Sequence, residues 1–254
     1  MTFIRVHSRS FAANSGMTLM EVMIAVLLFS ILSLGILFAL RIGINAMEHS
    51  NERLMANRKS AYAVRILESQ LTGFMPEEAL VQPTPQSPLQ AMPFFQGEPT
   101  AMRFVSSYSL QDAGRGMPQI LEYTVIPGAD GRGVRLIVNE RPYTGPISAG
   151  AVALGYQIDI PTRTRIPLFR PIVAGPASFV LADRLAFCRF RFETPRLGPQ
   201  FPAVWVDHWI RDNSPAAIRV EMAPLEPDPG RLQPMTVTSA VHVNKILGLE
   251  YADN

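Results

Sequence analysis

Residues 16–40 read GMTLMEVMIAVLLFSILSLGILFAL, and the part from Val22 to Leu40 holds nineteen residues without a charge. An α-helix rises about 1.5 Å per residue, so this part would span roughly 28 Å, close to the hydrocarbon thickness of a bilayer. The apolar run continues past Arg41, whose long side chain can reach the membrane interface. The stretch therefore predicts a membrane-inserted helix near the N-terminus.

A secretory signal peptide and a simple one-span anchor both fit this stretch less well. A signal peptide has an apolar core of about 7–15 residues followed by a small-residue cleavage site. Here the core is longer, and the Ile44-Asn45-Ala46 that follows is a poor cleavage site. A simple anchor accounts for the length but gives no role to Glu21, a carboxylate at the mouth of an apolar helix.

The order of features around the stretch is specific. The small residue Gly16 is followed by a mostly apolar tetrad at 17–20, by the carboxylate of Glu21, and then at once by the apolar run. A basic start precedes them, made of Arg5, His7 and Arg9. This order resembles the leader of type IV prepilins and pseudopilins.

The resemblance assigns roles to individual residues. It implies that residues 1–16 are a leader, which a membrane aspartic prepilin peptidase cuts between Gly16 and Met17. Met17 would become the N-methylated terminus, and Glu21 the fifth residue of the mature protein. An isolated carboxylate is costly in a dry helix bundle, so Glu21 would pair with the Met17 amine of a neighbouring subunit. The helix dipole would stabilise the same charge.

The segment departs from the family pattern at three points, and the third bears on the type of subunit. Met17 stands where Phe is most common and Met20 where Ile or Leu is usual, although both keep the apolar character. Many major pilins have a proline midway along the apolar helix, whereas this segment has none. The missing proline favours a minor subunit.

Helical periodicity continues beyond the apolar run, and no proline occurs before Pro76. We therefore expect one helix over residues 17–75, roughly 90 Å long, with a transmembrane first half and an amphipathic spine as its second half. The expected stripe consists of Met47, Leu54, Ala61, Val64, Leu67, Leu71 and Phe74. The resemblance implies an α+β, pilin-like fold in which this spine packs on an antiparallel β-sheet head formed by residues 76–254.

The head alternates turn signals with short β-rich segments. Strands are expected at residues 101–108, 119–126, 133–139, 179–192, 217–222 and 235–243, with a hairpin turn at 127–132. The proline-rich residues 76–100 are expected to form a loop, and residues 140–178 carry no clear pattern. Within 179–192, alternation predicts one face made of Ala186, Cys188, Phe190 and Phe192, with Cys188 as a small core side chain.

The C-terminal half of the head carries a second resemblance. A strand with alternating aromatic residues, a segment with Trp205 and Trp209, and then PAAIRVEM at 215–222 follow one another. This succession is similar to the J-type minor pseudopilin of type II secretion.

The sequence offers little for catalysis. The four histidines, at positions 7, 49, 208 and 242, are scattered, and no paired-Cys, H-E-x-x-H, G-x-S-x-G or Walker pattern occurs. Asp207 and His208 are adjacent, but neighbours on a strand point to opposite faces and do not by themselves make a dyad. Cys188 is the single cysteine, so no intrachain disulfide can form. We expect no catalytic residue, cofactor or metal site.

The net charge of the chain gives only weak support for binding to nucleic acid. The formal net charge is +2, and Arg5 and Arg9 of the leader account for both units. Basic residues interleaved with aromatic ones can form a platform for single-stranded DNA. Such a run consists of Arg163, Arg165, Arg170, Arg184, Arg189 and Arg191, with Phe169, Phe179 and Phe187. Near-neutral charge favours a solvated sheet face instead, so no nucleic-acid partner is expected.

The resemblances predict a minor pseudopilin of the J type, at the tip of a type II secretion pseudopilus. Its partners would be the I- and K-type minor pseudopilins, the major pseudopilin and the prepilin peptidase. It would cross the bacterial inner membrane once, with the N-terminus in the cytoplasm and the head in the periplasm. A minor pilin of a type IV pilus or DNA-uptake apparatus is the alternative. A membrane-anchored periplasmic enzyme or binding module would require the leader resemblance to be fortuitous.

Overall fold

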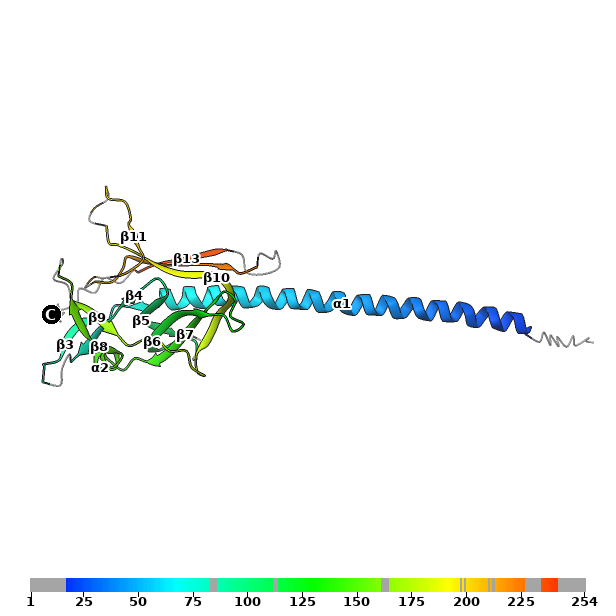
Figure 1. The fold of residues 1–254 in the computed structure, drawn as a ribbon, viewed down its shortest axis with the longest axis horizontal. Helices are drawn as coiled ribbons and strands as arrows, with labels where there is room; N and C mark the ends of the chain where they lie inside the picture. Colours follow the sequence, from blue (N-terminus) through cyan, green and yellow to red (C-terminus); the bar gives the residue numbers. More distant parts are fainter. Residues whose placement is uncertain are drawn as a thin grey trace, which may run out of the picture. The chain divides into compact units, whose positions relative to one another are not determined.

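The computed structural model describes residues 17–82, 86–111, 114–160, 165–196, 198, 200–209, 211, 213–226 and 234–241 (Figure 1). The chain divides into two compact units, residues 1–52 and residues 53–254. The long helix α1 (Leu19–Thr72) contributes its first part to one unit and its last turns to the other. Each unit is described by itself.

Helix α1 has clear start and stop signals. Its 54 residues contain no proline, and Thr18 lies immediately before it as a helix-capping residue. The helix ends at Thr72 and not near Met75, because Phe74 and Met75 form the short strand β1 (Phe74–Met75) opposite Ser106 and Val105. Gly73 permits this ending, since a Cβ there would lie 2.7 Å from the hydroxyl oxygen of Ser106.

Nine antiparallel strands form the main sheet of the second unit. Their order is β1-β5-β6-β7-β10-β12-β13, with β4 paired to β5 and β11 paired to β10. The remaining strands are β4 (Gln96–Gly97), β5 (Ala101–Ser109), β6 (Gly114–Pro127), β7 (Val134–Pro142), β10 (Phe179–Glu193), β11 (Trp205–Val206), β12 (Ala217–Pro224) and β13 (Met235–Ala240). All six strands expected from the sequence are confirmed, with ends that differ by a few residues. Residues 242–243 of the last expected strand lie outside the described residues.

The predicted hairpin between β6 and β7 is also confirmed. Pro127 pairs with Val134, and the Gly128 amide donates a hydrogen bond of 3.0 Å to the Gly133 carbonyl. Gly131 and Gly133 have φ values of 73° and 63°, which a residue with a side chain rarely adopts. The glycine-rich run is therefore a turn.

Strand β10 carries the sheet around a bend. Its first half pairs with β7 and its second half with β12, and its register shifts three times between Val180 and Phe187. Arg184, inside this irregular part, has a φ of 55°. The shifts bury Leu185 and leave Ala186 exposed, so the prediction that Ala186 faces the core is wrong. Cys188, like the two phenylalanines that follow on its face, is buried as expected.

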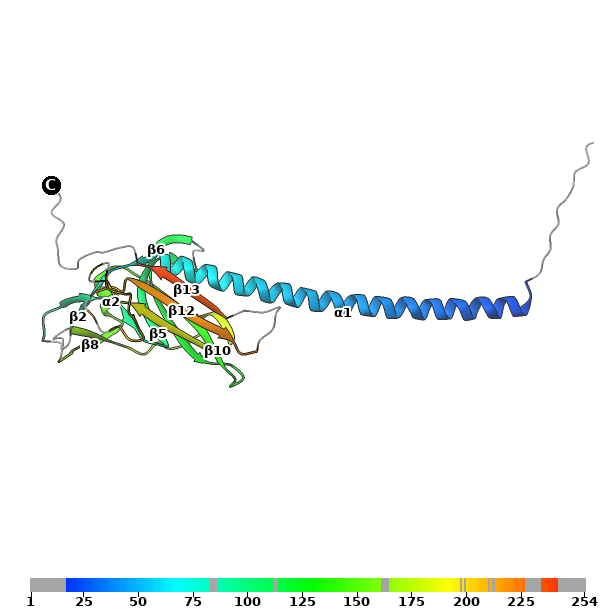
Figure 2. The same cartoon turned by 90° about the horizontal axis from the view of Figure 1, so that it is seen from above.

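The core of the second unit lies between the last turns of α1 and the curved sheet. Leu67 and Leu71 of the helix pack with Phe104, Tyr123 and Phe190 of the strands. Figure 1 draws β10 and β13 above these turns and β5, β6 and β7 below them, and Figure 2 shows β10, β12 and β13 side by side. This is an α+β architecture with a pilin-like arrangement of helix and antiparallel sheet.

The amphipathic stripe predicted for the spine is confirmed only in part. Leu67, Leu71 and Phe74 are buried, whereas Met47 is 74% exposed and Ala61 is also exposed. The side chain of Leu54 lies outside the described residues. Among the described side chains of α1, burial begins at Ala63, because the sheet of the second unit covers the last turns of the helix.

A smaller layer covers part of the other face of the sheet. It consists of β2 (Glu78–Val81), β3 (Gln90–Pro93), α2 (Pro146–Gly150), β8 (Ala153–Ile158) and β9 (Arg165–Phe169). Met92, Phe94 and Val152 of this layer pack on Val105 and Ile120 of the sheet. The prediction of a loop over residues 76–100 is therefore wrong, since three short strands lie there and Pro93 is the last residue of one of them. Residues 83–85 lie outside the described residues.

Candidate functional site

The candidate assembly segment begins at Met17. Gly16, the residue before the expected cleavage point, lies outside the described residues. Met17 and Thr18 are not helical, and Glu21 lies in the first turn of α1 with an exposed side chain. The amide of Glu21 donates hydrogen bonds to the carbonyl (3.0 Å) and the hydroxyl oxygen (3.3 Å) of Thr18. The structure thus places a carboxylate at the positive end of the helix dipole.

Thr18 and Glu21 have the spacing of a capping box, in which a Ser or Thr at the helix start is followed three residues later by Glu or Gln. The role of Thr18 is not among the features predicted from the sequence. The pattern Thr18-x-x-Glu21 is the signal that could have indicated it.

The part of α1 that follows presents apolar side chains all around its surface. The most apolar 18-residue window within Leu19–Glu48 has a mean hydropathy of 2.8, and none of it is buried. Phe29, Leu32 and Phe38 are 70%, 63% and 58% exposed. A helix in the core of a soluble protein would be covered, so this helix is suited by length and composition to serve as a membrane anchor.

A polar cluster joins the last turns of α1 to the sheet. The Gln70 side chain donates a hydrogen bond of 2.8 Å to Glu140 on β7 and accepts one from the hydroxyl of Tyr123 on β6. The Ser106 hydroxyl donates to the Gln70 carbonyl at 2.8 Å. Burial, reinforced by the charge of Glu140, holds the pKa of Tyr123 well above its usual range. The phenol therefore stays protonated as a donor.

Glu140 also holds the turn that connects β5 to β6. Its carboxylate accepts hydrogen bonds from the amides of Leu110 (2.7 Å) and Gln111 (3.2 Å) and from the hydroxyl of Ser109 (3.1 Å). One carboxylate thus ties together helix, strand and turn. This cluster fixes the last turns of α1 on the sheet of the second unit.

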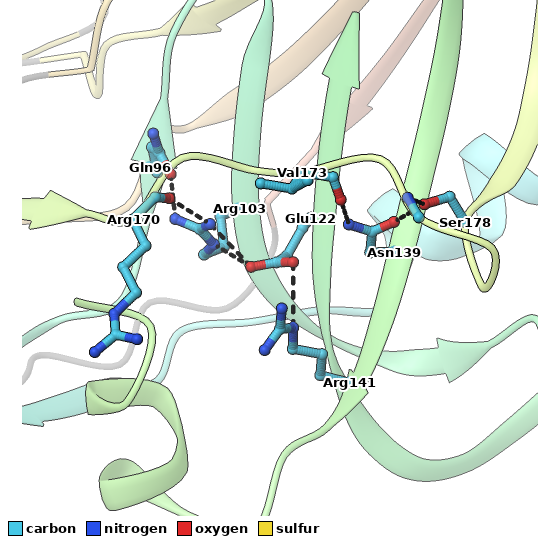
Figure 3. A network of polar contacts seen from close by, with 9 residues as sticks. Gln96, Arg103, Glu122, Asn139, Arg141, Arg170, Val173 and Ser178 are labelled. Atoms are coloured by element: carbon cyan, nitrogen blue, oxygen red, sulfur yellow. Dashed lines mark hydrogen bonds and ion pairs between the residues drawn. The ribbon is translucent and has the colours of Figure 1, made fainter. Parts of the chain in front are cut away.

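A second polar network lies on the opposite face of the sheet (Figure 3). Arg103 on β5 is 1% exposed, and its guanidinium contacts Glu122 at 2.9 Å, the Gln96 side chain at 2.6 Å and the Arg170 carbonyl at 3.0 Å. Arg141 approaches the other oxygen of Glu122 at 3.3 Å. Burial lowers the pKa of Arg103, and the charge of Glu122 opposes that shift.

The Arg103 network fastens a strap across the sheet. Figure 3 shows the segment from Arg170 to Ser178 crossing over the strands that carry Arg103, Glu122 and Asn139. Asn139 donates to the Val173 carbonyl at 3.1 Å and accepts from the Ser178 hydroxyl at 2.6 Å. These contacts satisfy the polar groups within the chain, so the network is a structural tie.

The described part of the chain brings together no catalytic constellation. The Asp207 carboxylate pairs with Arg191 at 2.9 Å, while the adjacent His208 is exposed. Burial raises the pKa of the Cys188 thiol to about 12, so it stays protonated at neutral pH. No group of three or more His, Cys, Asp or Glu side chains that could hold a metal occurs among the described residues.

Half of the arginine run considered as a DNA platform is paired with carboxylates in the fold. Arg184 pairs with Glu226 at 3.2 Å, Arg189 with Glu221 at 2.5 Å, and Arg191 with Asp207. Arg165 is the first residue of β9 in the small layer, and Arg170 directly follows this strand. Arg163 lies outside the described residues.

Comparison with known proteins gives one result for the N-terminal segment. Residues 12–37 match a protein family described as the prokaryotic N-terminal methylation motif, and this range contains Gly16, Met17 and Glu21. No curated protein matched the chain. The chain therefore carries a type IV pilin-like prepilin motif at the start of an apolar helix able to span a membrane, which supports a pilin- or pseudopilin-type structural subunit.

Proposed function

We propose that this chain is a minor pseudopilin, most similar to the J type, which supports protein export as part of the tip of a type II secretion pseudopilus. The observation that carries the proposal is the methylation motif at 12–37, which leads directly into an uncovered apolar helix. The same helix continues into the core of an antiparallel sheet. An apolar helix that continues into a head suits a subunit that leaves the bilayer to pack with its neighbours.

The proposed processing follows from the motif. A prepilin peptidase cuts between Gly16 and Met17, the new amine of Met17 is methylated, and the exposed Glu21 pairs with such an amine on another subunit. The helix is inserted in the inner membrane with the head in the periplasm. The I- and K-type minor pseudopilins and the major pseudopilin are the proposed partners.

The proposal is tested first by the mass of the mature full-length chain, expressed in a bacterium that has a prepilin peptidase. We expect a chain that begins at Met17 and carries one extra methyl group. Gly16→Leu, which puts a bulky side chain at the small-residue position, should leave the leader attached. A wild-type chain that keeps Met1 would contradict the proposal and favour a simple membrane anchor.

The type of machine is tested by co-purification from membranes. Recovery of the I- and K-type minor pseudopilins with the chain supports the secretion pseudopilus. Salt-sensitive DNA binding by the full chain would favour instead a minor pilin of a DNA-uptake apparatus, because phosphate contacts weaken steeply with salt.

A further inference from the structure

The outer face of the second half of β10 carries a group of arginines whose side chains are not part of the core. Alternation buries Cys188, Phe190 and Phe192 and turns Arg189 and Arg191 outward. In the register with β12, Arg189 lies opposite Glu221, and Arg191 lies opposite Arg219. We call this surface the arginine face and define it as Arg189, Arg191, Arg219, Glu221, Trp205 and Asp207.

Contacts within the arginine face hold each guanidinium in place. Arg189 contacts Glu221 at 2.5 Å, and Arg191 contacts Asp207 at 2.9 Å and the Trp205 carbonyl at 3.3 Å. Arg219 lies over the Trp205 ring, with its guanidinium carbon 3.8 Å from the ring centre. The three arginine side chains remain 56%, 29% and 29% exposed. They are ordered and still reachable from solvent.

The charges of the arginine face are not balanced within it. Three guanidinium groups share two carboxylates, those of Glu221 and Asp207. Glu193, which follows Arg191 on the same side of β10, pairs with a further arginine, Arg196, at 3.5 Å, so the surplus of one positive charge remains. Arg191 and Arg219 are also direct cross-strand neighbours, and like charges in that position destabilise a sheet. The two like charges repel each other in this position, and a carboxylate from outside, placed between Arg191 and Arg219, would relieve the repulsion.

We propose that the arginine face docks an acidic surface of a second, different pilin-like subunit, whose carboxylate lies between Arg191 and Arg219. This inference rests on the proposed function. Arginine and tryptophan are the residues that most often carry binding energy at protein interfaces. Side chains that are already ordered lose little freedom on binding, which favours a specific contact.

A protein partner fits this face better than nucleic acid does. Glu221 and Asp207 stand among the arginines and would face the phosphates of a bound strand. Affinity for nucleic acid grows with the number of phosphates that cationic side chains neutralise, and here most of the positive charge is already neutralised. The surplus of one positive charge matches one or a few carboxylates.

The proposal is tested by photo-crosslinking in intact membranes of a cell that contains the complete assembly. A photoreactive amino acid replaces Thr236, which is exposed on β13 opposite Glu221. The matched control replaces Val173, which is 73% exposed on the strap. We expect the Thr236 position, and not the Val173 position, to crosslink to a different protein that itself begins with a prepilin motif.

Charge-reversal variants then test whether the crosslink depends on the arginine face or only on the exposure of the labelled position. Arg191→Glu combined with Arg219→Glu should lower the crosslink yield at least about tenfold, the loss expected for interface hot spots. Arg191→Gln with Arg219→Gln is the milder variant and should also lower it. Arg165→Glu, an exposed arginine on β9, should leave the yield unchanged. Protection of Cys188 from labelling verifies that each variant is folded.

Several outcomes would overturn the proposal. One is that the Thr236 position crosslinks to DNA, to another copy of this chain or to a protein without a prepilin motif. Another is that it gives no crosslink at all. A third is that the crosslink survives both double variants in folded protein. A processed chain with any of these results overturns only the arginine-face proposal. A chain that keeps residues 1–16 overturns the proposed function as well.

Discussion

Glu21 occupies an environment in which three physical effects act on one carboxylate. It stands in the first turn of α1, beside the capping contact of Thr18, and directly before an uncovered apolar surface. The helix dipole favours its negative charge, and a capping box would order it locally. In a dry bundle of helices neither effect replaces an opposite charge, which is why we expect Glu21 to matter for assembly.

Glu21→Ala should leave membrane insertion intact, because the apolar run is unchanged, but should impair assembly with other subunits. Glu21→Gln is the informative partner variant, since glutamine preserves a capping box while removing the charge. We expect both variants in the membrane fraction and neither in the complexes recovered from it. Normal incorporation of Glu21→Gln would show that capping suffices and that charge pairing is dispensable.

Arg103→Met should destabilise the head strongly, by about 3–5 kcal/mol, because Glu122 would keep its buried charge without the main partner. Arg132→Met provides the control, since Arg132 forms an exposed pair with Glu226 and such pairs contribute about 0–1 kcal/mol. Tryptophan fluorescence of the full chain in detergent, followed against urea, measures both. A double variant, Arg103→Met with Glu122→Leu, should recover part of the loss.

Cys188 should resist alkylation in the folded chain and react rapidly in urea, because its thiol is buried and its pKa is raised to about 12. Thr238→Cys, exposed on β13, placed in a Cys188→Ala background, should react without denaturant. The pKa of the Cys188 thiol in the folded chain lies above its unfolded value of about 8.5. The buried, protonated thiol therefore makes its full contribution to the stability of the fold below about pH 8.5. It should be lost as the pH rises toward about 12, and rapid native labelling at neutral pH would contradict this account.

At the scale of elements, the joint between α1 and the sheet depends on polar contacts as well as on Leu67 and Leu71. Gln70 points into the core side of the helix, where a polar group would be costly without partners. Tyr123, Glu140 and Ser106 supply them. Because hydrogen bonds have direction, this cluster fixes the rotation of the helix more closely than apolar packing alone.

Glu140→Ala should destabilise this joint by about 3 kcal/mol, since it leaves several donors without an acceptor. Glu140→Gln should cost less, because one acceptor oxygen remains. Amide hydrogen exchange of the full chain in detergent should locate the effect in the last turns of α1 and in residues 109–111. A loss spread evenly over all strands would contradict the role assigned to Glu140.

At the scale of the whole molecule, the second compact unit contains its own core. Its boundary falls between Glu52 and Arg53, inside α1, and the first described side chain that is buried in it is that of Ala63. The last turns of the helix therefore belong to the head energetically. The preceding part of the helix presents apolar surface that the described chain does not cover.

A chain of residues 53–254 should fold as a soluble head with an ordered core, whereas residues 76–254 should not. The shorter piece lacks Leu67 and Leu71, and losing a large buried aliphatic side chain costs about 2–5 kcal/mol. Near-ultraviolet circular dichroism compares their tertiary packing, and dye binding reports exposed apolar surface. A cooperative unfolding transition for residues 76–254 would show that the spine is dispensable to the head.

Much of this architecture follows from local patterns. A charge-free run from Val22 to Leu40 can form only one kind of element in a bilayer, because every backbone polar group must be paired within the helix. The motif from Gly16 to Glu21 occupies six consecutive residues, so it can be recognised without knowledge of the fold. The alternation in β10 and the glycines between β6 and β7 are equally local signals.

Contacts between distant residues were decided only by the tertiary structure. The register shifts in β10 exposed Ala186, and the fold brought Arg103 to Glu122 and Gln70 to Glu140. Neither pair has a signature in the sequence, since Arg103 and Glu122 lie 19 residues apart and Gln70 and Glu140 lie 70 residues apart. Local composition determined a membrane-capable helix with a processing motif. The strand register and the packing of α1 on the sheet determined which polar and charged side chains meet, because Arg103 faces Glu122 only through the pairing of β5 with β6, and Gln70 reaches Glu140 only where the helix lies on the sheet.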